Sequence, residues 1–204
     1  MERRHGGPLG DLESVHVPKA TTRTGPGSAP WPGRWRRPVS YGSRVHFSEY
    51  QMRLAAYALI VDTDHPDGDR ILLSWWNGEG VGTPGWSLPG GGVEFEEQPT
   101  EGVVREVKEE TGYDIVVGDP ITVHTWSNPD GRPDRPLPFK AVRVLYDATV
   151  VGGELGTLEV GGSTDRAAWV PIDRLDDEPG ETTSIVRIAV SAHRSRSGAP
   201  PSDR

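Results

Sequence analysis

Short apolar segments separated by Gly- and Pro-rich loops dominate the chain from about residue 47 to about residue 193. Such segments are typical of β-strands bounded by turns. We predict strands at 54–61, 71–76, 115–117, 121–126, 139–149 and 167–170, and a short extended segment at 86–89. The polar turn at 62–69 joins the first two, so we expect these two strands to form a hairpin.

Residues 99–111 and 182–193 instead have the helical period. Their apolar faces consist of Val103, Val104 and Val107 in the first segment, and of Ile185, Val186, Ala189 and Val190 in the second. Pro99 suits the first turn of a helix, and Gly112 suits its end. Strands with one helix among them and another after them predict an α/β fold, in which a mixed β-sheet lies between helices.

The two ends of the chain differ in composition from the middle. Residues 1–47 are rich in Gly, Pro, Ser and Arg, and carry eight Lys/Arg against three Asp/Glu, a net charge of +5. We expect a mostly disordered basic extension at 1–47, a folded domain at 48–194 and a flexible tail at 195–204. The rest of the chain then carries −13, which disfavours general binding to nucleic acid, so we expect no nucleic-acid partner.

Composition also excludes several kinds of site. The chain contains no Cys, so disulfides, zinc thiolate sites and cysteine nucleophiles are ruled out. The longest apolar run, 54–61, is far shorter than the about 20 residues that a membrane-spanning helix needs. We therefore expect no membrane partner and a cytoplasmic location.

The predicted central helix carries an unusual group of acids. Glu106, Glu109 and Glu110 are spaced so that all three lie on one side of the helix, away from its apolar stripe. Their carboxylates repel one another unless a cation lies among them, and carboxylate oxygens are ligands that suit Mg2+ or Mn2+. A solvated acidic helix face is the alternative interpretation of these three residues alone.

The wider pattern decides between these interpretations. Gly91 is followed after five residues by Glu97, and after seven more by the run Arg105-Glu106-Val107-Lys108-Glu109-Glu110-Thr111-Gly112. This pattern, with the preceding Trp86-Ser87-Leu88-Pro89-Gly90, resembles the Nudix box. Tyr113 and Gly102 depart from the family's usual small aliphatic residue and Ala, and both positions serve packing rather than ligand binding. The resemblance covers about residues 50–180.

The resemblance implies a Nudix-type α/β/α sandwich with a mixed β-sheet and a Mg2+- or Mn2+-dependent active site. The implied metal ligands are Glu97, Glu106, Glu109, Glu110 and the backbone carbonyl near Gly90. Arg105 is expected to orient these acids. The base that takes a proton from the attacking water is a glutamate of the box or an acid of a later loop, for which Glu159 and Asp165 are the candidates.

The sequence says less about the substrate. Gly91 allows a ligand to approach the backbone closely, Trp86 offers a stacking surface, and Arg132 and Arg135 offer positive charge, so these four are the candidate substrate-binding residues. The resemblance implies hydrolysis of a phosphoanhydride bond in a nucleoside diphosphate derivative by metal-activated water. ADP-ribose, nucleoside triphosphates and dinucleoside polyphosphates all remain open. A Nudix module that binds a nucleotide without cleaving it is the alternative, and the resemblance also allows a homodimer.

Overall fold

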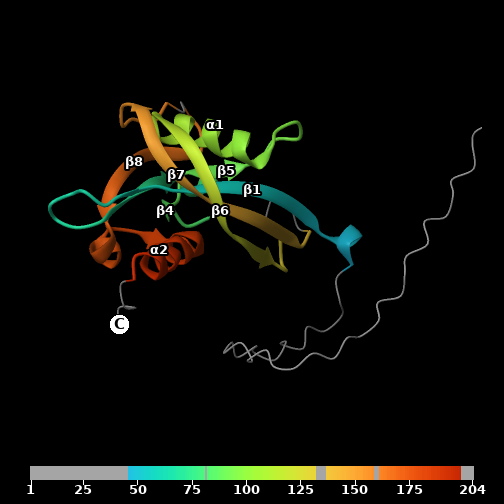
Figure 1. Ribbon diagram of the computed structural model, residues 1–204. Coiled ribbons are helices and arrows are strands. Elements are labelled where there is room, and N and C mark those ends of the chain that lie inside the picture. Colours follow the sequence, from blue (N-terminus) through green and yellow to red (C-terminus); the bar gives the residue numbers. More distant parts are fainter. Residues whose placement is uncertain (1–45, 81, 132–136, 159–160, 199–204) are drawn as a thin grey trace, which may run out of the picture. The chain divides into compact units, whose positions relative to one another are not determined.

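The computed structural model describes residues 46–80, 82–131, 137–158 and 161–198 (Figure 1). The elements in chain order are η1 (Phe47–Glu49), β1 (Gln51–Leu59), β2 (Val61–Asp62), β3 (Arg70–Trp76), η2 (Gly78–Gly80), β4 (Gly85–Ser87), β5 (Gly90–Gly92), α1 (Pro99–Thr111), β6 (Tyr113–Asn128), β7 (Phe139–Gly153), β8 (Thr164–Pro171), η3 (Ile172–Asp177), β9 (Glu181–Thr182) and α2 (Ser184–Arg196). None of the helices in this part of the chain is long and apolar enough to span a membrane.

The strands form two sheets that each mix parallel and antiparallel pairs. One has the order β5-β1-β7-β6, in which β1 and β7 run parallel and the other pairs antiparallel. The other has the order β2-β3-β4-β9, with β8 also paired to β3, and only β4 and β9 run parallel. The predicted mixed sheet is therefore confirmed, but it is divided into two.

The predicted hairpin between 54–61 and 71–76 is wrong. β1 ends at Leu59 and pairs with β5 and β7, and only the two residues of β2 continue antiparallel to β3. The chain passes from one sheet to the other at Ile60, whose carbonyl accepts a hydrogen bond of 3.0 Å from the backbone of Leu72. The apolar run 54–61 is therefore divided between two sheets, and the pattern of apolar residues alone does not reveal this division.

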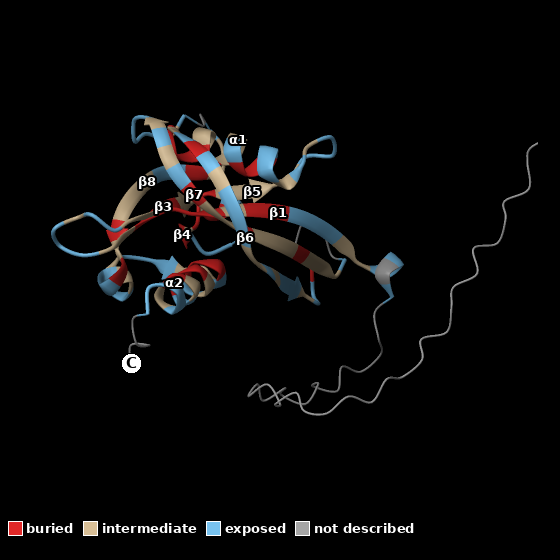
Figure 2. Ribbon diagram, in the orientation of Figure 1, coloured by how far each residue is buried: buried red, intermediate tan, exposed pale blue. Residues whose placement is uncertain are grey.

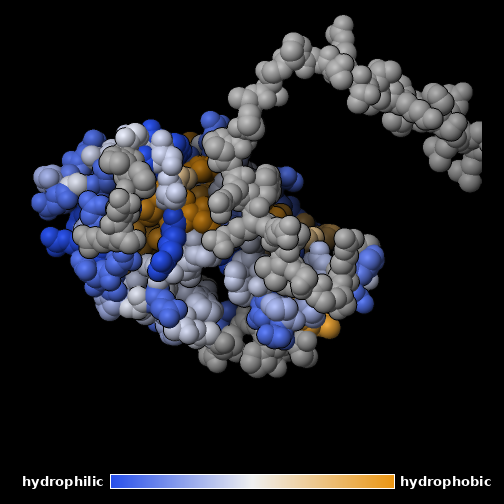
Figure 3. Space-filling view, turned by 90° about the horizontal axis from the view of Figure 1, so that it is seen from below, coloured by the Kyte–Doolittle hydropathy of each residue, from blue (hydrophilic) through white to orange (hydrophobic). Residues whose placement is uncertain are grey.

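The two helices cover opposite sides of the sheet that contains β1. Val103 and Val107 of α1 are fully buried against Ala56 and Ala58 of β1. The buried face of α2, formed by Ile185, Val186, Ala189 and Val190, packs in a second cluster with Leu59 and Leu145. Figure 2 shows these buried positions gathered between the layers. Seen from below, one face of the molecule shows a hydrophobic patch beside a largely hydrophilic area (Figure 3).

The predicted bounds of α1 are confirmed. Pro99 is its first residue, and Gly112 follows its last with a φ of 75° while its N–H donates to the carbonyl of Lys108. Of the three residues in the predicted apolar stripe, only Val104 is not buried, and it is 39% exposed. The helix therefore packs through the narrower pair Val103 and Val107, and its other sides are left for polar groups.

Two further boundaries differ from prediction. The segments 115–117 and 121–126 belong to one long strand, β6, whose register against β7 shifts on both sides of Pro120. Proline has no N–H to donate to a neighbouring strand, so the pairing changes there without ending. The second helix, α2, extends to Arg196, beyond the predicted end of the folded domain, and Arg196 is paired with Asp147 of β7.

Candidate functional site

Arg105 lies at the centre of the acidic side of α1. Its guanidinium binds Glu97 in a fork, with Nε at 2.6 Å from Oε1 and Nη2 at 2.9 Å from Oε2. Nη2 also donates to the carbonyl of Gly92 at 3.1 Å. The hydrogen bond from Arg105 is the main reason that the pKa of Glu97 is lowered to about 2. The loop before α1 and the helix itself are thus joined through one side chain.

The same guanidinium also contacts two acids of the helix. Its Nη1 lies 3.1 Å from Oε1 of Glu106 and 3.2 Å from Oε2 of Glu109. Arg105 therefore gathers Glu97, Glu106 and Glu109 around one positive charge. That Arg105 orients the acids for a metal stays a prediction, but the guanidinium does contact three of the four glutamates among the implied ligands.

Glu110 faces the other way, into the protein, and is 6% exposed. Its Oε2 accepts a hydrogen bond of 2.9 Å from the backbone of Gly90, and its Oε1 accepts one of 2.7 Å from the hydroxyl of Thr164. Burial raises the pKa of Glu110 to about 7, although the bonds from Thr164 and Gly90 act to lower it, and the charge of Glu106 raises it further. No basic side chain of the described residues forms an ion pair with Glu110.

Glu106 lies between these two arrangements. Burial raises its pKa, although Arg105 acts in the opposite direction. Its carboxylate packs directly on Gly91, where an added Cβ would lie only 2.8 Å from the carboxylate carbon. Two carboxylates with raised pKa values, Glu106 and Glu110, thus stand beside the backbone of β5. Arg105 offsets part of the charge of Glu106, whereas an ionised Glu110 is a buried charge that no basic side chain of the described residues pairs.

The carboxylate and carbonyl oxygens of these residues are donors that suit a divalent cation. No three acidic, histidine or cysteine side chains in the described parts of the chain form a closed metal-binding group. Arg105 holds three of the acids, and Glu110 is bonded to Gly90 and Thr164. The unpaired charge of Glu110 and the hard oxygen atoms of Glu106 and Glu110 nevertheless fit Mg2+ or Mn2+. A bound ion would therefore compete with Arg105 for the same carboxylates.

Comparison with known proteins decides the family. The model of the NUDIX domain matches residues 51–187, which include both sheets, α1 and all of these acids. The chain belongs to the Nudix family.

Individual relatives agree with this. The chain is 39% identical over 90 residues to an ADP-ribose pyrophosphatase of Methanocaldococcus jannaschii, a match over 44% of this chain and 48% of the relative. It is 31% identical over 93 residues to an 8-oxo-(d)GTP phosphatase of Mycolicibacterium smegmatis, a match over 46% of this chain and 26% of that protein. The aligned region thus spans less than half of either relative. A Nudix hydrolase structure from Nitrosomonas europaea superposes with a TM-score of 0.58 at 20% identity, covering 74% of this chain and 93% of that one, which shows the shared fold.

The Nudix box loop depends on its glycines. Gly90 has a φ of 132°, and an added Cβ there would lie 2.3 Å from the carbonyl oxygen of Ala56 on β1. Only glycine fits this conformation and this close approach. Gly90 and Gly91 therefore allow β5 to pair with β1 on one side while receiving Glu110 and Glu106 on the other.

The other predicted site residues lie in varied places. Trp86 is 2% exposed, and its ring packs at 81° against that of Trp75, with centroids 5.1 Å apart, so it belongs to the core and presents no open stacking face. Asp165 is exposed and accepts a hydrogen bond of 3.0 Å from Asn77. It has no partner in the pairing of β8 with β3, whose register shifts there. Glu159, Arg132 and Arg135 lie outside the described residues.

Thr164 is the site residue that sequence analysis missed. Its hydroxyl binds Glu110 from β8, a strand that pairs with β3 and begins 54 residues after the glutamate. A threonine next to a Gly-rich loop carries no signal of this role, because the contact depends on the packing of α1 against the second sheet.

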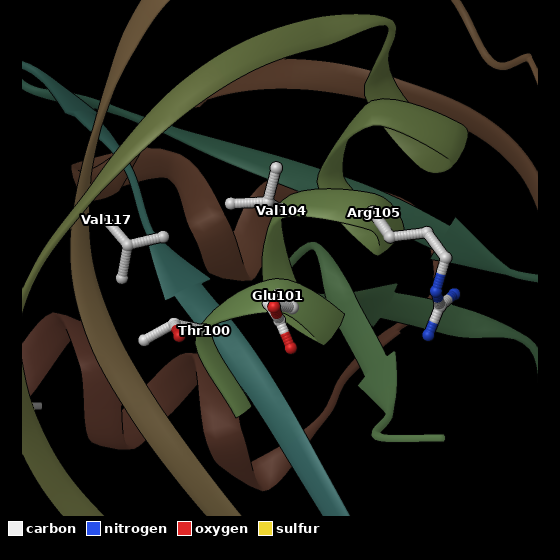
Figure 4. Close-up of a pocket in the computed structure, with 5 residues that line it drawn as sticks. All are labelled: Thr100, Glu101, Val104, Arg105 and Val117. Atoms are coloured by element: carbon white, nitrogen blue, oxygen red, sulfur yellow. The ribbon is translucent and has the colours of Figure 1, made fainter. Parts of the chain in front are cut away.

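A depression of about 490 Å3 lies elsewhere on α1, lined by Thr100, Glu101, Val104, Arg105 and Val117. Figure 4 shows Val104 and Val117 facing each other across it, while the guanidinium of Arg105 points away. The hollow therefore lies on the half-exposed apolar side of the helix, and Glu106, Glu109 and Glu110 do not line it.

Proposed function

We propose that this chain hydrolyses a phosphoanhydride bond in a nucleoside diphosphate derivative, in a reaction that requires Mg2+ or Mn2+. The observation that carries the proposal is the pair formed by the buried Glu110 and the partly buried Glu106, beside Gly90 and Gly91 in a Nudix box whose acids are all present. The names of the relatives, an ADP-ribose pyrophosphatase and an 8-oxo-(d)GTP phosphatase, support a substrate of this class.

We assign the metal to Glu97, Glu106, Glu109, Glu110 and the carbonyl of Gly90. A bound divalent ion would offset the negative charge of the phosphates and make a water molecule easier to deprotonate. Other residues of the chain would position the glutamates around this ion. Arg105 keeps Glu97, Glu106 and Glu109 close together in the protein before a ligand arrives, and Thr164 and Gly90 fix the direction of Glu110.

We place the general base among the glutamates of the box. Among them we prefer Glu109, because its side chain is 46% exposed, the most exposed of the acids that contact Arg105. Asp165 is less suited, because its carboxylate accepts a hydrogen bond from Asn77 and has no contact with the glutamates of the box among the described residues. Substitution of each acid by its amide, with pH–rate profiles, separates these assignments.

The experiment that tests the function is a panel of substrates with Mg2+ or Mn2+, comprising ADP-ribose, nucleoside triphosphates with and without 8-oxo bases, and dinucleoside polyphosphates. We expect release of a nucleoside monophosphate from at least one of them. Glu109→Gln and Glu110→Gln should each lower the rate by several orders of magnitude, and Glu101→Gln, at the exposed start of α1, is the control that should retain it. Binding of a nucleotide without turnover would instead favour a non-catalytic Nudix module.

A further inference from the structure

Arginine and alanine alternate on one face of the parallel strands β1 and β7. Arg53 pairs with Ala141, and Ala55 pairs with Arg143. Residues in register, and residues two apart in a strand, lie on the same face, so the four side chains form a square with the arginines at opposite corners. We call this the arginine–alanine square. Its two alanines are only 3% and 6% exposed, and their short side chains form a shallow surface between the two long cationic side chains.

Both guanidinium groups are held in place without a carboxylate. That of Arg53 lies over Gly92 of β5, where an added Cβ would be 2.4 Å from its Nη2. That of Arg143 donates a hydrogen bond of 3.2 Å to Ser184 at the start of α2 and lies 5.6 Å from the ring centre of Trp126. Neither forms an ion pair with any acid of the described residues. Two such cations in a chain with a net charge of −8 indicate a site for an anion.

An aromatic surface borders the arginine–alanine square on the next strand. Trp126 of β6 pairs with Ala141 and is 41% exposed, and the centre of its ring lies 6.1 Å from that of Phe139. His124, two residues earlier, pairs with Arg143, and its Nδ1 is buried without a hydrogen-bond partner among the described residues. A planar ring can stack on the exposed face of the Trp126 indole.

Tyr57 connects this surface to the glutamates. It lies two residues beyond Ala55 on the same face of β1 and pairs with Gly90. The N–H of Gly90 donates to Glu110, and the guanidinium of Arg53 lies over Gly92, two residues further along β5. The arginine and the buried carboxylate therefore both contact the three residues of one short strand. An anion bound by the arginines would lie next to the acids that we assign to the metal.

We propose that the arginine–alanine square binds the nucleoside monophosphate part of the substrate, with the phosphate between Arg53 and Arg143 and the base stacked on Trp126. This inference rests on the proposed function. It adds the position of the substrate: the nucleoside monophosphate on one side of the cleaved bond lies over β1, β7 and β6. The nucleoside monophosphate is then the product that this surface retains, and the other product leaves from the side of the glutamates.

The test measures binding of AMP, GMP, ribose 5-phosphate and inorganic phosphate to the metal-free protein by calorimetry, so that it does not depend on turnover. We expect AMP or GMP to bind more tightly than ribose 5-phosphate, because only they carry a base. Arg53→Gln and Arg143→Gln should each weaken nucleotide binding about tenfold. Trp126→Leu should weaken binding of the nucleotide but not of ribose 5-phosphate. Arg187→Gln, an equal change of charge at an exposed position of α2, is the matched control.

Kinetics separate this inference from the proposed function. With a substrate from the panel, Arg143→Gln should raise KM and leave kcat within a few-fold, whereas Glu110→Gln should lower kcat. If hydrolysis occurs and Arg53→Gln and Arg143→Gln alter neither KM nor AMP affinity, the inference is overturned and the function stands. If AMP binding depends on the arginines but no substrate is hydrolysed, the function fails and the binding surface stands.

Discussion

The hydroxyl of Thr164 donates a hydrogen bond of 2.7 Å to Oε1 of Glu110, although 54 residues separate the two in the chain. This bond joins β8 to the inward-facing end of the Nudix helix. It fixes one oxygen of a buried carboxylate, and the backbone of Gly90 fixes the other at 2.9 Å. The direction of Glu110 is therefore set by both sheets before any ligand binds.

We predict that Thr164→Val lowers both stability and metal affinity. It removes a hydrogen bond to a buried carboxylate, a loss of about 1–3 kcal/mol in the free energy of unfolding, measured by urea denaturation. Mn2+ affinity, measured by EPR titration, should fall as well, because Glu110 is no longer held toward β5. Thr164→Ser keeps the hydroxyl and should recover most of the Mn2+ affinity. Equal Mn2+ affinity in the Val and Ser variants would show that the hydroxyl does not position Glu110.

The buried Glu110 should also make stability depend on pH. Its pKa is raised from 4.5 to about 7, so the folded protein keeps a proton that the unfolded chain has already lost. The stabilisation from this proton is complete below pH 4.5 and is lost as the pH rises through 7, which amounts to about 3 kcal/mol. We expect urea denaturation of the metal-free protein to show this fall, and Glu110→Gln to reduce it. The same pH dependence in both proteins would mean that Glu110 is not its source.

Arg105 offers a test of geometry at constant charge. Arg105→Lys keeps the positive charge but cannot form the fork to Glu97 while contacting Glu106 and Glu109. We expect turnover to fall about 10- to 100-fold, as is common when a residue that orients metal ligands is replaced. Steady-state kinetics over a range of Mg2+ concentrations measures this effect. Unchanged turnover in the Lys variant would show that charge alone is sufficient at this position.

The contact between Gly91 and Glu106 can be tested by adding one methyl group. Gly91→Ala places a Cβ 2.8 Å from the carboxylate carbon of Glu106 and should push that side chain out of position. We expect a large loss of turnover with a small change in melting temperature. Gly156→Ala is the matched control, because an added Cβ there has no atom within 4 Å. Comparable turnover in the two variants would show that Glu106 does not need the space that Gly91 leaves for it.

Local signals in the sequence predicted the bounds of α1 correctly, because Pro99 and Gly112 mark the ends of the helix. The spacing of Arg105, Glu106 and Glu109 also brings these three side chains together, as helix geometry requires. These features need no knowledge of the rest of the fold. Glu110 was expected on the same side, but it turns inward to Gly90 and Thr164.

Features that depend on distant partners were not predicted. β1 pairs with β7, more than 80 residues away, and not with the nearby β3, so the expected hairpin is absent. Trp86 is buried by Trp75 and the surrounding core rather than open to a ligand. Arg53 and Arg143 gave no signal in the sequence, because only the register of two parallel strands brings them together.

Titration of the metal-free protein with Mn2+, followed by EPR, tests the central claim that the carboxylates of α1 hold a divalent ion. The account predicts that Mn2+ binds saturably and that Mg2+ displaces it. Glu106→Gln and Glu110→Gln should each weaken Mn2+ binding strongly, whereas Glu101→Gln should leave it unchanged. Absence of Mn2+ binding, or binding of the same strength in all three variants, would contradict the account.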